Sequence, residues 1–210
     1  MSKIKPTIGI TKKDIAASYE SLSERATPNF VFVVLTSGAA AICSFGFKMD
    51  NVSVIVGAMV VSPLLYSVVC MSVASCKRDW AMVFQGTLTL IIGLCIAIGT
   101  SVFLNTFFTA NQGSEILTRL GGSDVDYFFV AFFSGLAGTL AFFWPKIIEA
   151  VAGIAISVAL IPPVVMVGIG LAHLDYGLIV KSVGIVGTNI VGIFLGSFLM
   201  FLTLHYLAKK

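Results

Sequence analysis

Six apolar runs account for most of this chain, and each is at or near the length that crosses a lipid bilayer. A hydrocarbon core of about 30 Å needs roughly 20 apolar residues in a helix. Hydrophobic residues make up 58% of the 210 residues and charged ones only 11%, against about 25% charged in soluble domains. We therefore predict an all-α polytopic membrane protein with six transmembrane helices, at residues 30–47, 52–73, 81–104, 128–143, 150–172 and 180–204.

Proline lies near the middle of the second and fifth runs. Pro63 lies in the second run and Pro162 with Pro163 in the fifth, so that Pro63 and Pro163 are 100 positions apart. Proline removes a backbone N–H. At membrane depth this loss is tolerated where other groups satisfy the freed backbone, and broken helices in two matching halves are typical of transporter binding sites. We predict that the second and fifth helices are broken at these prolines.

Small residues at four-residue spacing in the third run recur 99 positions later in the sixth run, as Thr89, Gly93 and Ala97 against Thr188, Gly192 and Gly196. Such ridges let helix backbones approach closely, and helix packing is the role we expect for them. The repeating unit thus contains three spans. Two consecutive units with an odd number of crossings enter the membrane from opposite sides, so we predict two inverted three-helix repeats.

The corresponding division of the chain is a tail at 1–29, repeats at 30–104 and 128–210, and an extracytoplasmic linker loop at 105–127. Within that loop, Glu115 and Arg119 have the spacing of an ion pair on a helix. The tail carries a capping-box pattern at 11–14, followed by apolar residues at helical spacing. We expect an amphipathic helix there, which lies on the cytoplasmic membrane surface or packs on the loops of its own protein. No cleaved leader is expected.

Basic residues favour one side of the predicted membrane arrangement. If the tail, the second and fourth loops and the C-terminus share a side, that side carries ten Lys and Arg residues, and the other carries three, Lys48, Arg119 and Lys181. By the positive-inside rule, both termini lie in the cytoplasm. The positive charge is spread over the loops, so nucleic acid is not an expected partner.

The two breaks provide the candidate substrate path. Without an N–H on the prolines, carbonyls in the preceding turns lack their helical donors. Freed carbonyls suit a dehydrated cation or a neutral solute, whereas the N-termini of the following half-helices suit an anionic group. The candidate path residues are Gly57, Ala58, Met59, Ser62, Pro63, Ser157, Val158, Ala159, Pro162, Pro163 and Asn189. The alternative is a pair of ordinary kinked helices capped by hydroxyls or water, with Asn189 bonded to another helix.

Ionisable residues are absent from the centres of all six predicted spans. Proton relays and charge-coupled pumps usually have such residues, so we do not expect proton-driven antiport through a buried carboxylate. The candidate serines also lack a base within reach, and we do not expect an enzyme. The four cysteines lack CxxC spacing and nearby histidines, which argues against a metal and any other cofactor.

Several of these residues form a pattern that resembles a known family. Residues 56–64, the loop at 114–119, the run at 153–163 and the pair Thr188 and Asn189 are similar to the prokaryotic membrane family called the uncharacterised hydrophobic domain. The resemblance covers residues 25–205. It implies a multi-span prokaryotic membrane protein without an assigned substrate, and it carries over no catalytic residue.

We therefore expect a transport protein of the cell membrane that moves a small solute or ion past the two broken helices. Two alternatives stay open. One is a passive channel built by an oligomer, since six short spans in a 22.3 kDa chain leave limited room for an internal path. The other is a non-transporting scaffold or sensor that acts through the basic tail. The expected partners are the lipid bilayer, an unidentified solute or ion, and further copies of the chain in a homo-oligomer.

Overall fold

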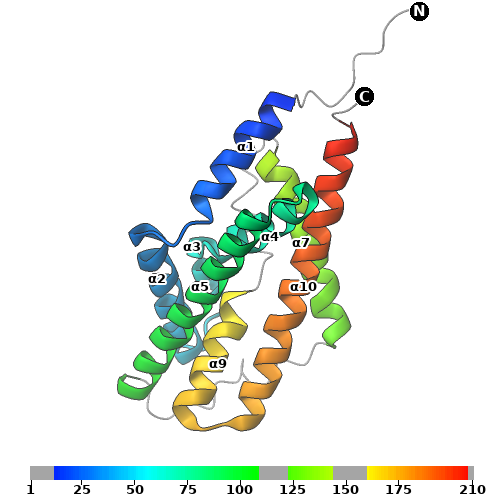
Figure 1. The fold of residues 1–210 in the computed structure, drawn as a ribbon. Coiled ribbons are helices and arrows are strands. Elements are labelled where there is room, and N and C mark those ends of the chain that lie inside the picture. The colour runs from blue at the N-terminus through cyan, green and yellow to red at the C-terminus, as the bar shows by residue number, and fades with distance from the viewer. Residues whose placement is uncertain (1–11, 109–122, 144–159, 208–210) are drawn as a thin grey trace, which may run out of the picture.

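The computed structural model describes residues 12–108, 123–143 and 160–207, and every regular element in these ranges is a helix (Figure 1). The prediction of an all-α chain is confirmed for this part of the protein. The helices are α1 (Lys12–Arg25), α2 (Phe30–Lys48), α3 (Val52–Val61), α4 (Leu64–Lys77), α5 (Trp80–Phe107), α7 (Asp124–Phe143), α9 (Ile161–His173) and α10 (Tyr176–Leu207).

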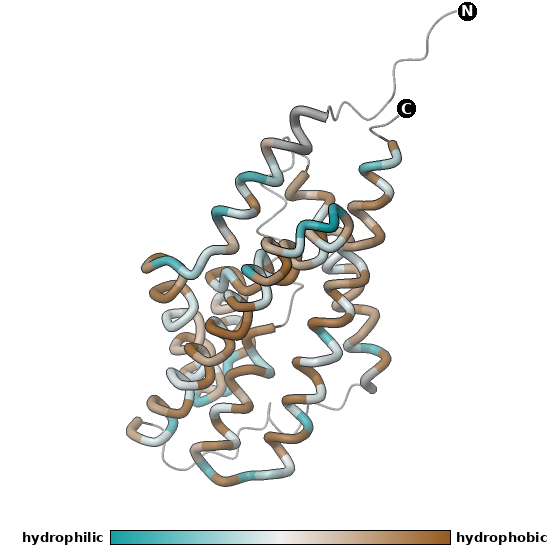
Figure 2. Tube along the Cα trace, viewed as in Figure 1, coloured by the Kyte–Doolittle hydropathy of each residue, from teal (hydrophilic) through white to brown (hydrophobic). Residues whose placement is uncertain are grey.

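Four helices are individually long and apolar enough to cross a membrane, namely α2, α5, α7 and α10. A fifth candidate span consists of α3 and α4, which are bent by 48° at the short break between them. The apolar helix α9 has 13 residues, and the first half of the fifth predicted span, before residue 160, lies outside the described residues. Hydrophobic residues run along most of the length of these helices (Figure 2), and many of the large ones are exposed. Exposed apolar residues on helices of this length are typical of a multi-pass membrane protein, whose outer side chains face lipid.

Corresponding helices of the two predicted units run in opposite directions. In Figure 1, α5 runs from the end of the molecule that carries α1 toward the opposite end, whereas α10 runs back toward it; α2 and α7 are likewise antiparallel. The first and last described residues therefore lie at the same end. The turn from α4 to α5 lies toward that end and the turn from α9 to α10 at the other.

These two turns have the same backbone structure. Arg78 has φ 57° and ψ 30°, and Leu174, 96 positions later, has φ 56° and ψ 32°. In each turn the next residue is an aspartate whose amide donates to the carbonyl five residues back, at 3.0 Å for Asp79 and 2.9 Å for Asp175. Each aspartate also accepts from the amide three residues on, at 3.2 Å and 3.0 Å. Both helix pairs are thus joined by a left-handed C-cap followed by an Asp N-cap.

Glycines allow the long helices to touch backbone to backbone. A Cβ added at Gly192 would lie 2.8 Å from the Phe128 carbonyl oxygen of α7, and one at Gly196 would meet the Phe132 carbonyl. The Ser197 hydroxyl donates across the same contact to the Gly135 carbonyl at 3.2 Å. The ridge in the sixth span therefore packs helices, as predicted from its spacing.

Helix α1 packs on its own protein through its C-terminal half. Leu22 and Ala26 are fully buried, and the Thr89 hydroxyl of α5 donates to the Ala26 carbonyl at 2.8 Å. The Tyr19 hydroxyl donates to the Asp79 carboxylate at 2.9 Å. Of the two placements that the sequence left open for this helix, these contacts favour packing on the protein.

Candidate functional site

The break between α3 and α4 lies at Ser62 and Pro63. Helix α3 ends at Val61, and Ser62 is extended, with φ −71° and ψ 128°. Because Pro63 has no N–H, the carbonyl of Met59 cannot receive the helical bond from four residues on. The amide of Leu64 faces the Ser62 hydroxyl at 3.4 Å, a distance at which the bond is weak. The break therefore leaves backbone acceptors of α3 without their regular donors.

Burial differs among the predicted path residues of this first region. Ala58 and Pro63 are buried, while Met59 and Ser62 are half-buried. Gly57 is exposed, and a Cβ added there would have no atom within 4 Å. The structure thus brings Met59, Ser62 and Pro63 together at the bend and places Gly57 on an outer surface.

The second proline region is arranged differently. Pro162 and Pro163 are buried in the first turn of α9, after Leu160 at the N-cap. Helical N–H groups have no intrahelical partner in a first turn, so proline is tolerated there. Pro63 instead directly precedes α4, so the two proline positions, 100 residues apart, are not structurally equivalent. Predicted path residues Ser157, Val158 and Ala159 and the predicted loop pair Glu115 and Arg119 lie outside the described residues.

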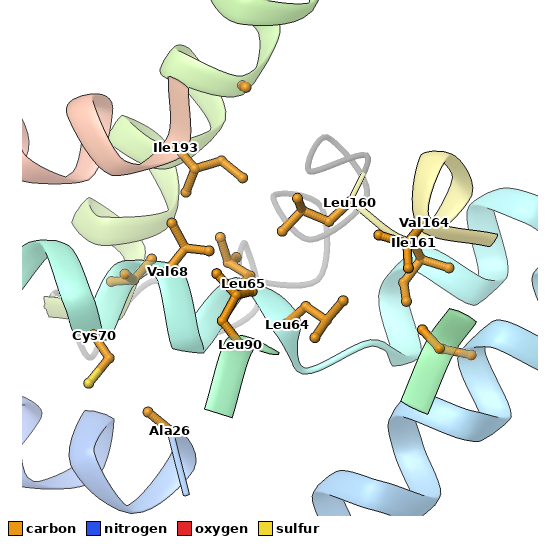
Figure 3. Packing of buried hydrophobic residues seen from close by; sticks show 14 of the residues in the cluster. Ala26, Leu64, Leu65, Val68, Cys70, Leu90, Leu160, Ile161, Val164 and Ile193 are labelled. Atoms are coloured by element: carbon orange, nitrogen blue, oxygen red, sulfur yellow. The ribbon is translucent and has the colours of Figure 1, made fainter. Parts of the chain in front are cut away.

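Apolar residues that follow both proline regions belong to the buried core. Leu64, Leu65 and Val68 of α4 belong to the same buried cluster as Leu160, Ile161 and Val164 of the α9 region. Figure 3 shows Leu160 directed toward the α4 residues, with Ile193 of α10 on the same side. The sequence predicted a cluster of acceptors and small hydroxyls here. Because three of the predicted residues lie outside the described part of the chain, the cluster stays a prediction, while the described side chains that follow the prolines belong to the apolar core.

Buried serines lie on the helices that follow the break. The Ser72 hydroxyl of α4 donates to the Phe194 carbonyl of α10 at 2.9 Å, and the Ser101 hydroxyl of α5 donates to the Val165 carbonyl of α9 at 2.8 Å. The Ser67 hydroxyl, one turn after the break, is fully buried with no hydrogen-bond partner in the described protein. Sequence reasoning missed Ser67 and Ser72, since a serine in an apolar run gives no signal of the direction in which it points.

Asn189 of α10 is 4% exposed. It precedes Ile193 by four residues, so both lie on the same face of α10, and Ile193 belongs to the buried cluster. The predicted path residue of the sixth span therefore lies on the inner side of the bundle.

Formal charges lie at the helix ends. The Met82 amide and the Tyr19 hydroxyl donate to the Asp79 carboxylate and hold its pKa below the ordinary value. Burial raises the pKa of Tyr19, and the neighbouring Asp79 adds to the shift. At the other end Lys48 donates to the Phe108 carbonyl at 2.8 Å. Among the described residues, no buried side chain is ionisable apart from the cysteines, and no group of three His, Cys, Asp or Glu residues could hold a metal ion.

The helical fold, the apolar outer surface and the bent span define a multi-pass α-helical membrane protein. The family described as "Domain of unknown function (DUF389)" matches residues 59–195, which are 137 of the 210 residues. The chain belongs to this family. The match begins at Met59 and includes the break at Ser62 and Pro63. No curated protein and no solved structure matches the chain.

Proposed function

We propose that this protein moves a small solute or ion across the membrane, along a path that passes the Ser62–Pro63 break. The observation that carries the proposal is a bent candidate membrane span whose break at Pro63 leaves the Met59 carbonyl without its helical donor. In the helix that follows the break, the Ser67 hydroxyl is buried with no hydrogen-bond partner in the described protein. Backbone irregularity at membrane depth is tolerated where it is buried in protein or lines a path. Unpaired acceptors there provide groups that replace the hydration of a solute.

An inverted repeat supports this proposal. The matching turns at Arg78 and Leu174, 96 positions apart, together with the opposite directions of α5 and α10 (Figure 1), are what two units related by an axis in the membrane plane would produce. The cross-contacts are reciprocal as well: Ser72 joins α4 to α10, and Ser101 joins α5 to α9. Transporters with this architecture alternate access by rocking one unit against the other around a central site.

Orientation follows from the charges at the two ends. Lys77 and Arg78 lie in the turn toward the end that carries α1 and the end of α10, while Lys48 and Lys181 lie toward the opposite end (Figure 1). The sequence before α1 and after α10 is also basic, so we assign both termini to the cytoplasm of a cell membrane. The proposal includes no catalytic step, because within the described residues no buried His, Asp or Glu accompanies the buried serines.

A passive channel formed between subunits is the second candidate. The specific observation in its favour is the apolar core of the single chain, to which both α4 and α9 contribute buried residues. A path between copies of the chain would not need to pass through that core.

Reconstitution into liposomes tests the function. We expect the purified protein to take up at least one member of a panel of Na⁺, K⁺, phosphate, amino acids and sugars, with saturation at high solute for a transporter and a linear ohmic current for a channel. No uptake of any panel member by the folded protein, in either direction, would contradict the proposal.

A proline variant tests the break. Pro63→Ala restores an N–H for the Met59 carbonyl and lets α3 and α4 join as one helix, so we expect it to lose most of the uptake while staying folded. Pro28→Ala, in the exposed segment before α2, is the matched control and should transport like the wild type. A folded Pro63→Ala protein with unchanged uptake would remove the break from the mechanism.

A further inference from the structure

Two helix contacts between the predicted units are built on equivalent positions. Helix α4 packs on α10, and α9 packs on α5. In the first contact the Ser72 hydroxyl donates to the Phe194 carbonyl at 2.9 Å. In the second contact Gly168 lies beside the Ile98 carbonyl, since a Cβ added to this glycine would be 2.9 Å from that oxygen. Gly168 follows Ser72 by 96 positions, which is the separation of the two matching turns. Phe194 follows Ile98 by the same 96 positions.

The helix that carries the hydroxyl differs between the two contacts. A side chain at Gly168 would meet Ser101, whose Cβ and Oγ lie 2.5 Å and 2.6 Å from the added Cβ. Ser101 supplies the donor instead, at 2.8 Å from the Val165 carbonyl, and Asn105 donates to the Ser101 Oγ at 3.3 Å. Ser197, which follows Ser101 by 96 positions, donates to α7 within its own unit. Each contact thus has one serine that ties one unit to the other.

The two bonds lie toward opposite ends of the molecule. Ser72 is in the part of α4 that approaches the turn to α5, whereas Ser101 is in the last turns of α5, away from that turn (Figure 1). The Cys76 thiol, one turn after Ser72, faces the Phe198 carbonyl of α10 at 3.8 Å. A single hydrogen bond between membrane helices is weak enough to break reversibly. Separation of the units at either end therefore requires the loss of one such bond.

We propose that the bonds from Ser72 and Ser101 are two opposed latches, each of which holds the units together at one end of the molecule. This inference rests on the proposed rocking of the units in transport and adds what controls it. The Ser72 bond breaks when α4 leaves α10, and the Ser101 bond breaks when α9 leaves α5. Because the same two units carry both contacts, loss of one latch favours separation at its own end and contact at the other.

Thiol labelling at the two ends tests the latches in liposomes that contain no transported solute. Cys76 reports on the contact between α4 and α10. The substitution Ala172→Cys, present in every protein compared, provides the matched reporter on α9. Ala172 follows Cys76 by 96 positions, is half-buried like it, and lies one turn after Gly168 on the same face of the helix. The labelling rate of each thiol with N-ethylmaleimide is measured separately by peptide mass spectrometry.

We expect Ser72→Ala to speed the labelling of Cys76 about threefold and to slow the labelling at position 172, and Ser101→Ala to do the reverse. Threefold is the change in population that a typical hydrogen bond between membrane helices would give. Each acceptor carbonyl lies within a helix that continues beyond it. Both variants therefore keep the regular main-chain bonds, and we expect them to fold.

Two serines that bond within one unit provide the controls. The Ser75 hydroxyl donates to the Met71 carbonyl of its own helix at 2.7 Å, so Ser75→Ala is matched to the α4 latch. Ser197→Ala removes the equivalent of Ser101, whose bond stays inside the second unit. Both control variants should leave the ratio of the two labelling rates unchanged.

The outcomes separate the latches from the transport function. A latch variant that speeds labelling only at its own end has loosened a local contact, and this result overturns the latches, as do unchanged rates at both ends. If the wild type nevertheless takes up a panel solute, transport stands without them. Opposite shifts at the two ends, in a protein that takes up no panel solute, support the latches and overturn transport.

Discussion

Replacement of Gly196 by alanine tests the backbone contact between α10 and α7. A Cβ at Gly196 would lie 2.9 Å from the Phe132 carbonyl carbon and 3.0 Å from the Leu136 nitrogen, and it would be closer still to the Phe132 oxygen. These are main-chain atoms of α7, so no side chain can rotate away and the two helices must separate. The matched control is Gly187→Ala on the same helix, where an added Cβ would have no atom within 4 Å.

The difference between the two variants isolates the cost of the clash. Alanine favours a helix over glycine by up to about 1 kcal/mol, and this gain is common to both variants and cancels in the comparison. Forcing extra atoms into a packed contact costs about 1–3 kcal/mol. We expect the upper part of that range, since the atoms in the way are backbone, so Gly196→Ala should be less stable than Gly187→Ala by about 2–3 kcal/mol.

Reversible unfolding by SDS in mixed micelles, followed by far-UV circular dichroism, measures both free energies of unfolding. Equal stabilities for the two variants would refute the close approach of α10 to α7. A destabilised control with a stable Gly196→Ala protein would mean that the outer and inner faces of α10 are exchanged.

Three further predictions concern α1 and the cysteines. Because the pKa of Asp79 is lowered in the folded protein, its stabilising contribution is complete above the unfolded-state pKa and is lost as the pH falls through the lower, folded value. As the pH falls through that value, hydrogen exchange of residues 12–29 should accelerate by more than the intrinsic exchange rate changes. Tyr19→Phe should reduce this pH dependence. Thr89→Val removes the hydroxyl that bonds to the end of α1 and should destabilise the protein by about 1 kcal/mol in the same SDS titration, and an unchanged midpoint would contradict the bond. Cys95 is exposed and Cys43 buried, so a small thiol reagent in detergent should label Cys95 first and Cys43 only after unfolding; the reverse order would contradict the orientation of these helices.

The sequence predicted the helices well because apolar length is a local property. The runs at 30–47 and 81–104 correspond to α2 and α5, which extend a few residues further at their polar ends. The position of the first break was also predictable, since Pro63 lacks an N–H wherever the rest of the chain lies. The glycines of α10 that contact α7 were visible as a four-residue spacing.

The two matching turns were not predictable in the same way. Their left-handed positions are usually glycine, but here they are Arg78 and Leu174, which give no signal in the sequence. The prolines Pro63 and Pro163 are 100 positions apart, whereas the two turns are 96 positions apart. The sequence therefore aligned residues that occupy different places in their helices.

By itself, then, the sequence determined that this chain is a bundle of membrane helices with one of them interrupted at Pro63, because hydrophobic length and the missing N–H act locally. Only the tertiary structure decided which apolar residues are buried in the core, such as Leu64 and Val164, and which are exposed, such as Phe103 and Leu199. The physical reason is that an apolar side chain is equally well solvated by lipid and by a protein interior. Hydrophobicity alone cannot tell the inner face of a membrane helix from the outer one.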